Sequence, residues 1–187
     1  MKKKLTFLFS LLIISNLMAQ KYETQTYETI QFFDEAELRY YPPVMKIKSP
    51  RSNGFRALFS YISGNNKTNQ KISMTTPVYM RQDEQGEEVM EFVLPKDMDQ
   101  SNTPSSNSQI VEVYESHSGY FIAIGFGGYA MERIVRKATD TLKAIAEKHN
   151  LRIKSSPLLL VYDSPYKLMN RKNEILFEIE NPSTVGE

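Results

Sequence analysis

The 187-residue sequence contains no cysteine. Disulfide bonds, catalytic thiols and thiolate metal sites are therefore excluded, and the domain must be held together by its hydrophobic core. Histidine is scarce too, since only His117 and His149 are present. Neither has a second histidine or a carboxylate at the spacing of metal ligands, so we expect no zinc or di-metal site and no Ser-His-Asp centre.

The sequence also lacks an excess of charge of either sign. Lysine and arginine number 23 against 22 aspartate and glutamate residues, for a net charge of +1. No basic run occurs after Lys2, Lys3 and Lys4. Because phosphate binding needs clustered positive charge, nucleic acid is not an expected partner.

Long hydrophobic runs are missing apart from one near the N-terminus. Leu5–Leu17 is shorter than the roughly 20 apolar residues of a membrane-spanning helix. It follows three lysines and precedes Met18-Ala19-Gln20, the pattern of a signal peptide. We predict a signal peptide over 1–20 and a single domain over 21–187, exported to the periplasm or the extracellular space without a membrane span.

After the leader, apolar residues at helical spacing predict two helices. Phe55, Leu58, Phe59 and Ile62 fall at i, i+3, i+4 and i+7, which predicts a helix between Gly54 and Gly64. This apolar stripe can pack on a sheet or can line an apolar ligand pocket. A longer amphipathic pattern predicts a second helix from Tyr129 to about His149.

Strands surround both predicted helices in the same order. Each helix follows one strand and precedes two more, and the two helices start roughly 75 residues apart, which indicates a repeated unit. The expected strands lie at 36–41, 44–48, 77–81, 89–94, 110–115, 120–126, 157–162 and 174–179. We therefore predict an α+β fold in which a duplicated β-α-β-β unit closes a distorted antiparallel β-barrel with both helices outside.

Three segments carry a resemblance to a known family. Gly54 to Val78 holds the pattern GFxxLxxYIxGxNxxxxKIxMTxPV, and Phe126–Ala130 and Tyr162–Glu174 follow in order. Together they resemble the SOUL/heme-binding protein family. The resemblance implies a barrel with two helices and a non-catalytic protein that binds heme or another small planar apolar ligand.

The resemblance also implies candidate binding residues. The macrocycle slot would consist of the helical stripe, namely Phe55, Leu58, Phe59 and Ile62, together with Met74, Val78 and Met80. Lys167 matches a lysine that the family places at the heme edge, and Arg171 lies nearby in the sequence. Tyr40 stands where some members carry a histidine, and tyrosinate can ligate ferric heme iron. Since other members bind heme without an obvious axial ligand, we expect weak, mainly hydrophobic binding.

Other interpretations remain open at this point. The doubled unit also resembles bacterial effector-binding domains that hold small cations against a buried glutamate, a part that Glu174 could play. A hydrolase would need a paired acid and base, which the sequence does not show. Gly125–Ala130 fits G-x-G-x-x-A but lacks the βα series of a nucleotide-binding fold. The oligomeric state is left open.

Overall fold

The computed structural model describes residues 22–83 and 85–182. The predicted signal peptide lies outside the described residues. The elements are β1 (Glu23–Thr24), β2 (Glu28–Phe33), β3 (Ala36–Tyr41), β4 (Met45–Pro50), α1 (Gly54–Ile62), β5 (Thr75–Thr76), β6 (Val78–Gln82), β7 (Glu88–Val93), β8 (Glu112–Glu115), β9 (Gly119–Gly127), α2 (Glu132–Lys148), β10 (Leu158–Val161) and β11 (Lys172–Ile179).

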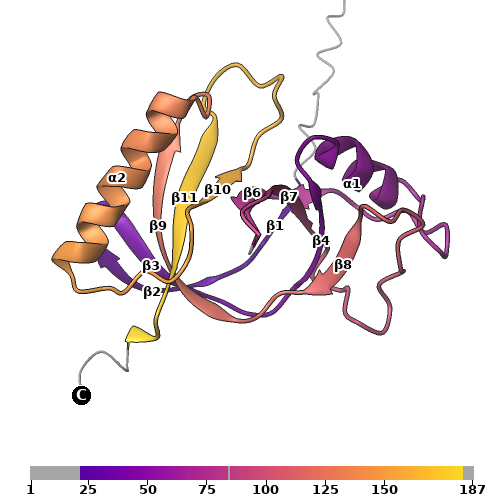
Figure 1. Ribbon diagram of the computed structural model, residues 1–187, viewed down its shortest axis with the longest axis horizontal. Coiled ribbons are helices and arrows are strands. Elements are labelled where there is room, and N and C mark those ends of the chain that lie inside the picture. Colours follow the sequence, from indigo (N-terminus) through magenta and orange to yellow (C-terminus); the bar gives the residue numbers. More distant parts are fainter. Residues whose placement is uncertain (1–21, 84, 183–187) are drawn as a thin grey trace, which may run out of the picture.

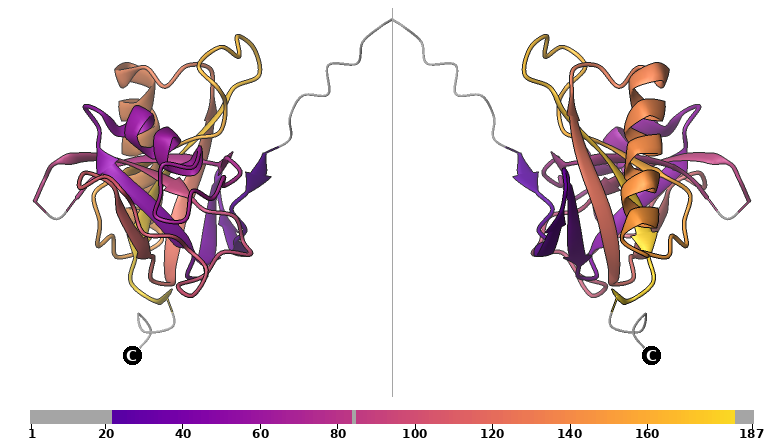
Figure 2. Two further views of the ribbon diagram at one scale, coloured as in Figure 1. Left: turned by 90° about the vertical axis from the view of Figure 1, so that its right-hand side faces the viewer. Right: turned by 90° about the vertical axis from the view of Figure 1, so that its left-hand side faces the viewer.

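Nine of these strands form one antiparallel sheet. Its order is β2-β3-β9-β11-β10-β6-β7-β4-β8, and a separate short parallel pair joins β1 to β5. Figure 1 shows the sheet bent so that α2 and α1 lie outside its two halves, and Figure 2 shows α2 running along the long strands. The α+β class is confirmed. The predicted closed barrel is not found in the described residues, because β2 and β8 remain the edges of an open, curved sheet.

The two predicted β-α-β-β units lie side by side. β4, α1, β6 and β7 form one half, and β9, α2, β10 and β11 form the other. They meet at a β10–β6 ladder in which Leu160 pairs with Tyr79. We call this ladder the seam. That the two halves arose by duplication stays a prediction.

Both helices cover the same face of the sheet. Alternate residues of β9 and β11, such as Ile122, Ile175 and Phe177, pack against α2. Met90 and Phe92 of β7 pack against α1 in the same way. The opposite, helix-free face carries a third cluster that is rich in tyrosine. Because side chains alternate along a strand, this face takes every second residue of each strand.

Candidate functional site

The helix-free face carries two buried carboxylates in one row of the sheet. Glu174 on β11 pairs with Leu160, Leu160 pairs with Tyr79, and Tyr79 pairs with Glu91 on β7. Both glutamates are buried. They lie one strand to either side of the seam, so each half of the sheet contributes one.

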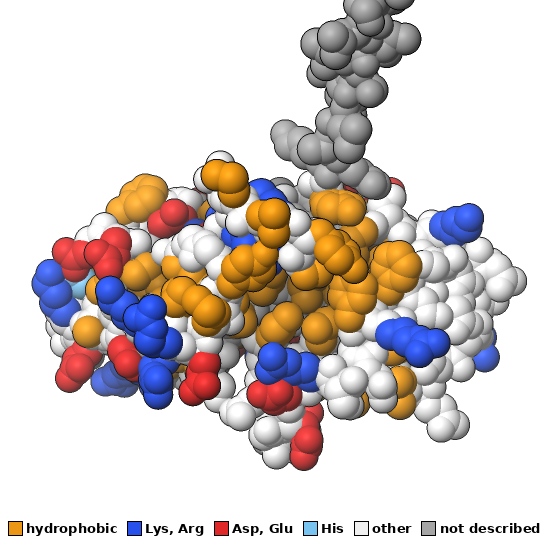
Figure 3. Space-filling model, turned by 90° about the horizontal axis from the view of Figure 1, so that it is seen from above, with side chains coloured by type: hydrophobic (Ala, Val, Ile, Leu, Met, Phe, Trp, Pro, Cys, Tyr) orange, Lys and Arg blue, Asp and Glu red, His pale blue; other side chains and the backbone are white. Residues whose placement is uncertain are grey.

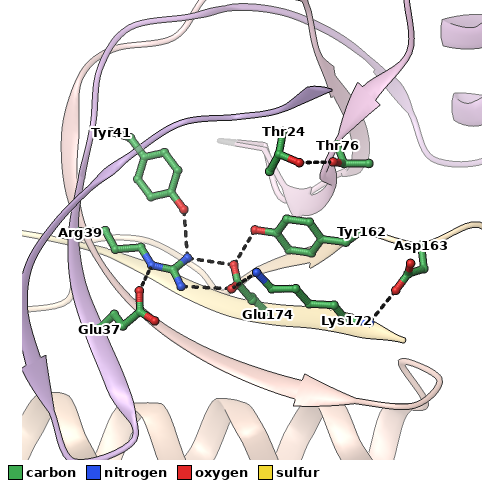
Figure 4. A network of polar contacts seen from close by, with 9 residues as sticks. All are labelled: Thr24, Glu37, Arg39, Tyr41, Thr76, Tyr162, Asp163, Lys172 and Glu174. Carbon is green, nitrogen blue, oxygen red and sulfur yellow. Dashed lines mark hydrogen bonds and ion pairs between the residues drawn. The ribbon is translucent and has the colours of Figure 1, made fainter. Parts of the chain in front are cut away.

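Glu174 is surrounded by hydrogen-bond donors (Figure 4). Arg39 Nη1 donates to Oε2 at 2.9 Å and Arg39 Nη2 to Oε1 at 3.1 Å. The Tyr162 hydroxyl donates to Oε2 at 2.6 Å, and Lys172 Nζ lies 3.2 Å from Oε1. Burial alone would raise the pKa of Glu174, but the bonds from Arg39 and Tyr162 outweigh it and hold that pKa below its ordinary value.

The groups around Glu174 are themselves held in place. Arg39 donates to Glu37 Oε2 at 2.8 Å, and its guanidinium lies 4.0 Å from the centre of the Tyr27 ring. Burial and the adjacent Glu174 carboxylate raise the pKa of Tyr162, so its hydroxyl remains a donor. The Glu174 carboxylate is therefore neutralised by its cationic partners, and its lone pairs are already engaged, so it cannot act as a general base.

Glu91 forms the second centre. Arg81 Nε donates to Oε1 at 2.7 Å, and Lys46 Nζ lies 3.3 Å from Oε2. Lys46 is also 3.6 Å from the centre of the Tyr79 ring. Burial lowers the pKa of Lys46, while Lys46 and Arg81 overcome the burial of Glu91 and hold its pKa below the ordinary value. Each half of the helix-free face thus places a cation between a carboxylate and a tyrosine ring.

An N-terminal segment, residues 22–27, lies against this face. Gln25 N donates to Thr76 O at 2.8 Å, and the Tyr79 hydroxyl donates to Gln25 Oε1 at 2.7 Å. Tyr27 packs on Tyr41 with ring centres 5.1 Å apart. The polar row is therefore covered by the chain itself.

The predicted helical stripe of α1 divides into two parts. Leu58 and Ile62 are buried in the core between α1 and the sheet, with Met74, Val78 and Met80 packed at its margin. Phe55 and Phe59 are 51% and 49% exposed, and their rings stack 5.9 Å apart at 9°. Two of the four residues of the helical stripe therefore fill the core, and two form an aromatic surface.

The β10–β11 loop, residues 162–171, contains the two predicted cations. Lys167 Nζ lies 2.6 Å from Asp163 Oδ1. The Arg171 guanidinium is buried and donates to the backbone oxygens of Ser164 and Lys167 at 2.6 and 2.9 Å. Arg171 thereby fixes the shape of the loop.

The tip of the β10–β11 loop is apolar. Tyr166, Leu168 and Met169 are 89%, 78% and 75% exposed. Figure 3 shows hydrophobic side chains gathered in a band over this loop and α1. We call this band the apolar face. The predicted site did not include the three tip residues, although an apolar cluster among Ser, Pro and Asn residues is a signal that could have found them.

Tyr40 does not lie with the other predicted residues. It pairs with Tyr120 on β9, and the two rings are 5.2 Å apart. The β10–β11 loop joins β11 at Lys172, which pairs with Gly127 on β9. Gly127 lies seven residues after Tyr120 along that strand. At about 3.3 Å per residue the separation is roughly 23 Å. Iron ligation by Tyr40 is untested, and the structure does not bring Tyr40 next to Lys167.

Two further properties bear on the possible sites. No group of three or more His, Cys, Asp or Glu residues able to hold a metal ion occurs in residues 22–83 and 85–182. Across the same part of the chain, neither helix has the length and apolar composition to cross a bilayer.

Comparisons with known proteins identify related families and folds. A family model described as SOUL heme-binding protein matches residues 22–178. No curated protein matches the chain. Among solved structures, the C-terminal domain of EcmrR has a TM-score of 0.54 at 16% identity, covering 83% of this chain and 98% of that one. A hydrolase from Listeria innocua has a TM-score of 0.56 at 9% identity, covering 78% and 92% respectively. At these identities the solved structures show a shared fold alone.

Proposed function

Because the chain belongs to the SOUL heme-binding family, we propose that it binds heme or a related tetrapyrrole, without catalysis, on the apolar face. The observation that carries the proposal is the gathering of exposed apolar side chains from two elements on one face (Figure 3). Phe55 and Phe59 supply stacked rings on α1, and the loop tip supplies Tyr166, Leu168 and Met169. Single exposed hydrophobic residues are ordinary, but a contiguous patch indicates a binding surface.

The chemistry of a tetrapyrrole fits this surface. A flat macrocycle can bury apolar area against the aromatic pair and the loop tip, at about 25 cal/mol per Å². Lys167 lies between the tip residues Tyr166 and Leu168 in the sequence, and its ammonium would exchange the Asp163 carboxylate for a ligand carboxylate. Tyr40 is not part of this site. The binding we propose is therefore mainly hydrophobic and serves capture, buffering or transport.

Hemin titration followed by Soret absorbance tests the proposal. The chain from Lys21 should bind hemin, and Phe59→Ser should weaken the binding about tenfold through lost aromatic contact. Phe32→Ser is the matched control, because Phe32 is an exposed aromatic residue on β2, in the other half of the sheet. Equal affinity of all three proteins, or no binding by the unmodified chain, would contradict the proposal.

Export is part of the proposed function and rests on the leader. The basic, apolar and small-residue segments of 1–20 carry it. In an expressing cell, the mature protein should begin at Gln20 or Lys21 and appear outside the cytoplasm. N-terminal sequencing of the fractionated protein is the measurement, and an intact leader in the cytoplasmic fraction would oppose export.

The second candidate is a module that binds small cations at Glu174. The burial of Glu174 at the centre of the fold favours this candidate. However, Arg39, Lys172 and Tyr162 already contact both oxygens of its carboxylate. A cationic ligand would have to displace Arg39. Quenching of a cationic dye by the protein, with no response to hemin, would support this candidate over the tetrapyrrole.

A further inference from the structure

The β10–β11 loop is held together by polar groups, while its apolar side chains face solvent. The Arg171 guanidinium donates to three backbone oxygens of the loop, and the Asp163 carboxylate accepts a bond from a backbone N–H at 2.6 Å. The side chains of Tyr166, Leu168 and Met169 at the tip are mainly exposed. A partner that covers these three side chains would therefore gain free energy without disturbing the loop.

The loop tip projects between the two helices. Figure 1 shows the β10–β11 loop between the start of α2 and α1, on the same side of the molecule. Tyr129 and Met131, just before α2, are 44% and 57% exposed. The ring centre of Tyr129 lies 4.5 Å from the Arg171 guanidinium, so these residues lie next to the loop. The apolar face therefore continues from α1 across the loop tip to the start of α2.

The cations beside the apolar face have no carboxylate partners. Residues 51–82 contain no aspartate or glutamate, although acidic and basic residues are nearly balanced in the whole chain. In residues 22–83 and 85–182, six exposed cations of α1, the loop after it and the first two turns of α2 form no ion pair, namely Arg56, Lys67, Lys71, Arg133, Arg136 and Lys137. In contrast, Lys148, Arg152 and Lys154 near the other end of α2 pair with carboxylates at 2.8 to 3.5 Å. The apolar face is therefore bordered by net positive charge.

We propose that the apolar face docks the protein on the surface of an anionic lipid bilayer, with the loop tip inserted between the headgroups. Apolar and tyrosine side chains are favoured at the boundary between headgroups and acyl chains, and lysine and arginine are attracted to anionic lipids. A second copy of the chain is a poorer occupant, because two such faces would bring like charges together.

The position of the cations fits this docking. Figure 1 shows α2 starting on the side of the loop and running away from it. At 1.5 Å per residue, residues 133–137 lie within about 8 Å of the start of the helix. This is comparable with the roughly 5–10 Å to which peripheral segments enter a bilayer, so these cations would reach the headgroup phosphates.

A single tryptophan tests the insertion of the loop tip. The chain contains no tryptophan, so a substituted one reports only its own surroundings. Tyr166→Trp keeps an aromatic ring at the tip, and Phe32→Trp is the matched control at an exposed aromatic position on β2. Vesicles of equal parts phosphatidylcholine and phosphatidylglycerol should shift the emission of Tyr166→Trp alone to shorter wavelength. Equal shifts in both variants, or none in either, would overturn the docking.

Co-sedimentation with the same vesicles tests the charge. Arg136 and Lys143 are exposed cations on one side of α2, and Lys143 lies about 10 Å further from the start of the helix. Arg136→Glu should weaken vesicle binding at least about fivefold, and Lys143→Glu should weaken it less. Binding should also be weaker to vesicles of phosphatidylcholine alone. Equal effects of the two substitutions, or equal binding to both kinds of vesicle, would contradict docking by this face.

The inference goes beyond the proposed function and does not depend on it, because the vesicle experiments contain no hemin. Hemin binding without vesicle binding would overturn the docking alone, and vesicle binding without hemin binding would overturn the proposed function alone. A dimer in solution that is lost in the variant Leu168→Ser/Met169→Ser would assign the apolar face to a second copy of the chain, and would also overturn the docking.

Discussion

The Arg39 guanidinium bonds both oxygens of the Glu174 carboxylate, at 2.9 and 3.1 Å, although β9 lies between their strands. Both residues are buried. The pair therefore ties β3 to β11 across an intervening strand, on the face that the helices leave uncovered. Removing Arg39 takes away the bidentate partner of a buried carboxylate and leaves it only Lys172 and Tyr162.

We predict that Arg39→Met lowers the free energy of unfolding by about 3–5 kcal/mol, the range typical of a broken buried pair. The double variant Arg39→Met/Glu174→Met should recover part of this loss, because it also removes the buried carboxylate that has lost its bidentate partner. Arg152→Met is the matched control: Arg152 and Glu180 form an exposed pair, so its loss should cost less than about 1 kcal/mol. Urea unfolding of the four proteins is the measurement, and equal losses in the two single variants would contradict the assignment.

The buried carboxylates predict a loss of stability in acid. The pKa values of Glu174 and Glu91 are lowered on folding, below an ordinary value of 4.5. A group with a lowered folded-state pKa stabilises the protein above its unfolded pKa and loses that contribution as the pH falls through the folded value. The melting temperature should therefore decrease as the pH is lowered past about 4.5, and this decrease should be smaller in Glu174→Gln than in the unmodified protein. An identical pH profile for that variant would exclude Glu174 as a contributor.

The division of the α1 stripe predicts two different mutational outcomes. Leu58 is fully buried, so Leu58→Ala should cost about 2–5 kcal/mol in unfolding free energy. Phe59→Ala should cost less than about 1 kcal/mol, because half of its side chain already faces solvent. Thermal or urea unfolding distinguishes them. A large cost at Phe59 would show that its ring supports the core.

The loop tip predicts a loss of hemin affinity without a loss of stability. Leu168→Ser with Met169→Ser removes two exposed apolar side chains from the apolar face, and each contributes on the order of 1 kcal/mol when covered by a ligand. Hemin should bind at least about tenfold more weakly, with the melting temperature unchanged. Ile30→Ser on β2 is the control, since Ile30 is also exposed. Unchanged hemin affinity in the loop variant would remove the tip from the site.

Tyr40 gives a spectroscopic prediction. Because it lies roughly 23 Å along β9 from the end beside the loop, Tyr40→Phe should leave the Soret band of the hemin complex unchanged. A shifted band would show that Tyr40 coordinates iron, and would place the ligand at the other end of the sheet.

Local patterns were enough to predict most of the fold. Spacing placed α1 within a residue or two of its ends, and alternation found β3, β6, β7, β9 and β11. The start of α2 was placed too early because Met131 is extended, and β2 was missed because its alternation is irregular and nearly all of it is exposed. The closure of the sheet depends on whether its edges meet, and no local pattern reports that.

The site could be predicted only in part. Of the predicted residues, Phe55 and Phe59 are exposed on α1, while Leu58 and Ile62 share their helical spacing but face the core. Phe55 lies at the margin of the contact between α1 and the sheet, with its ring centre 5.6 Å from that of Phe92 on β7. Ligand binding by any of these predicted residues stays a prediction. The pairing of Arg39 with Glu174 joins residues 135 apart in sequence, which spacing alone cannot reveal.

The seam described above joins the two halves through only three register pairs, from Leu159–Met80 to Val161–Val78, whereas β9 and β11 share eight. The backbone ladder between β9 and β11, within one half, is therefore longer than the ladder that joins the two halves. If force were applied across the sheet, the hydrogen bonds of the seam should break first, because this ladder is shorter than the ladder between β9 and β11.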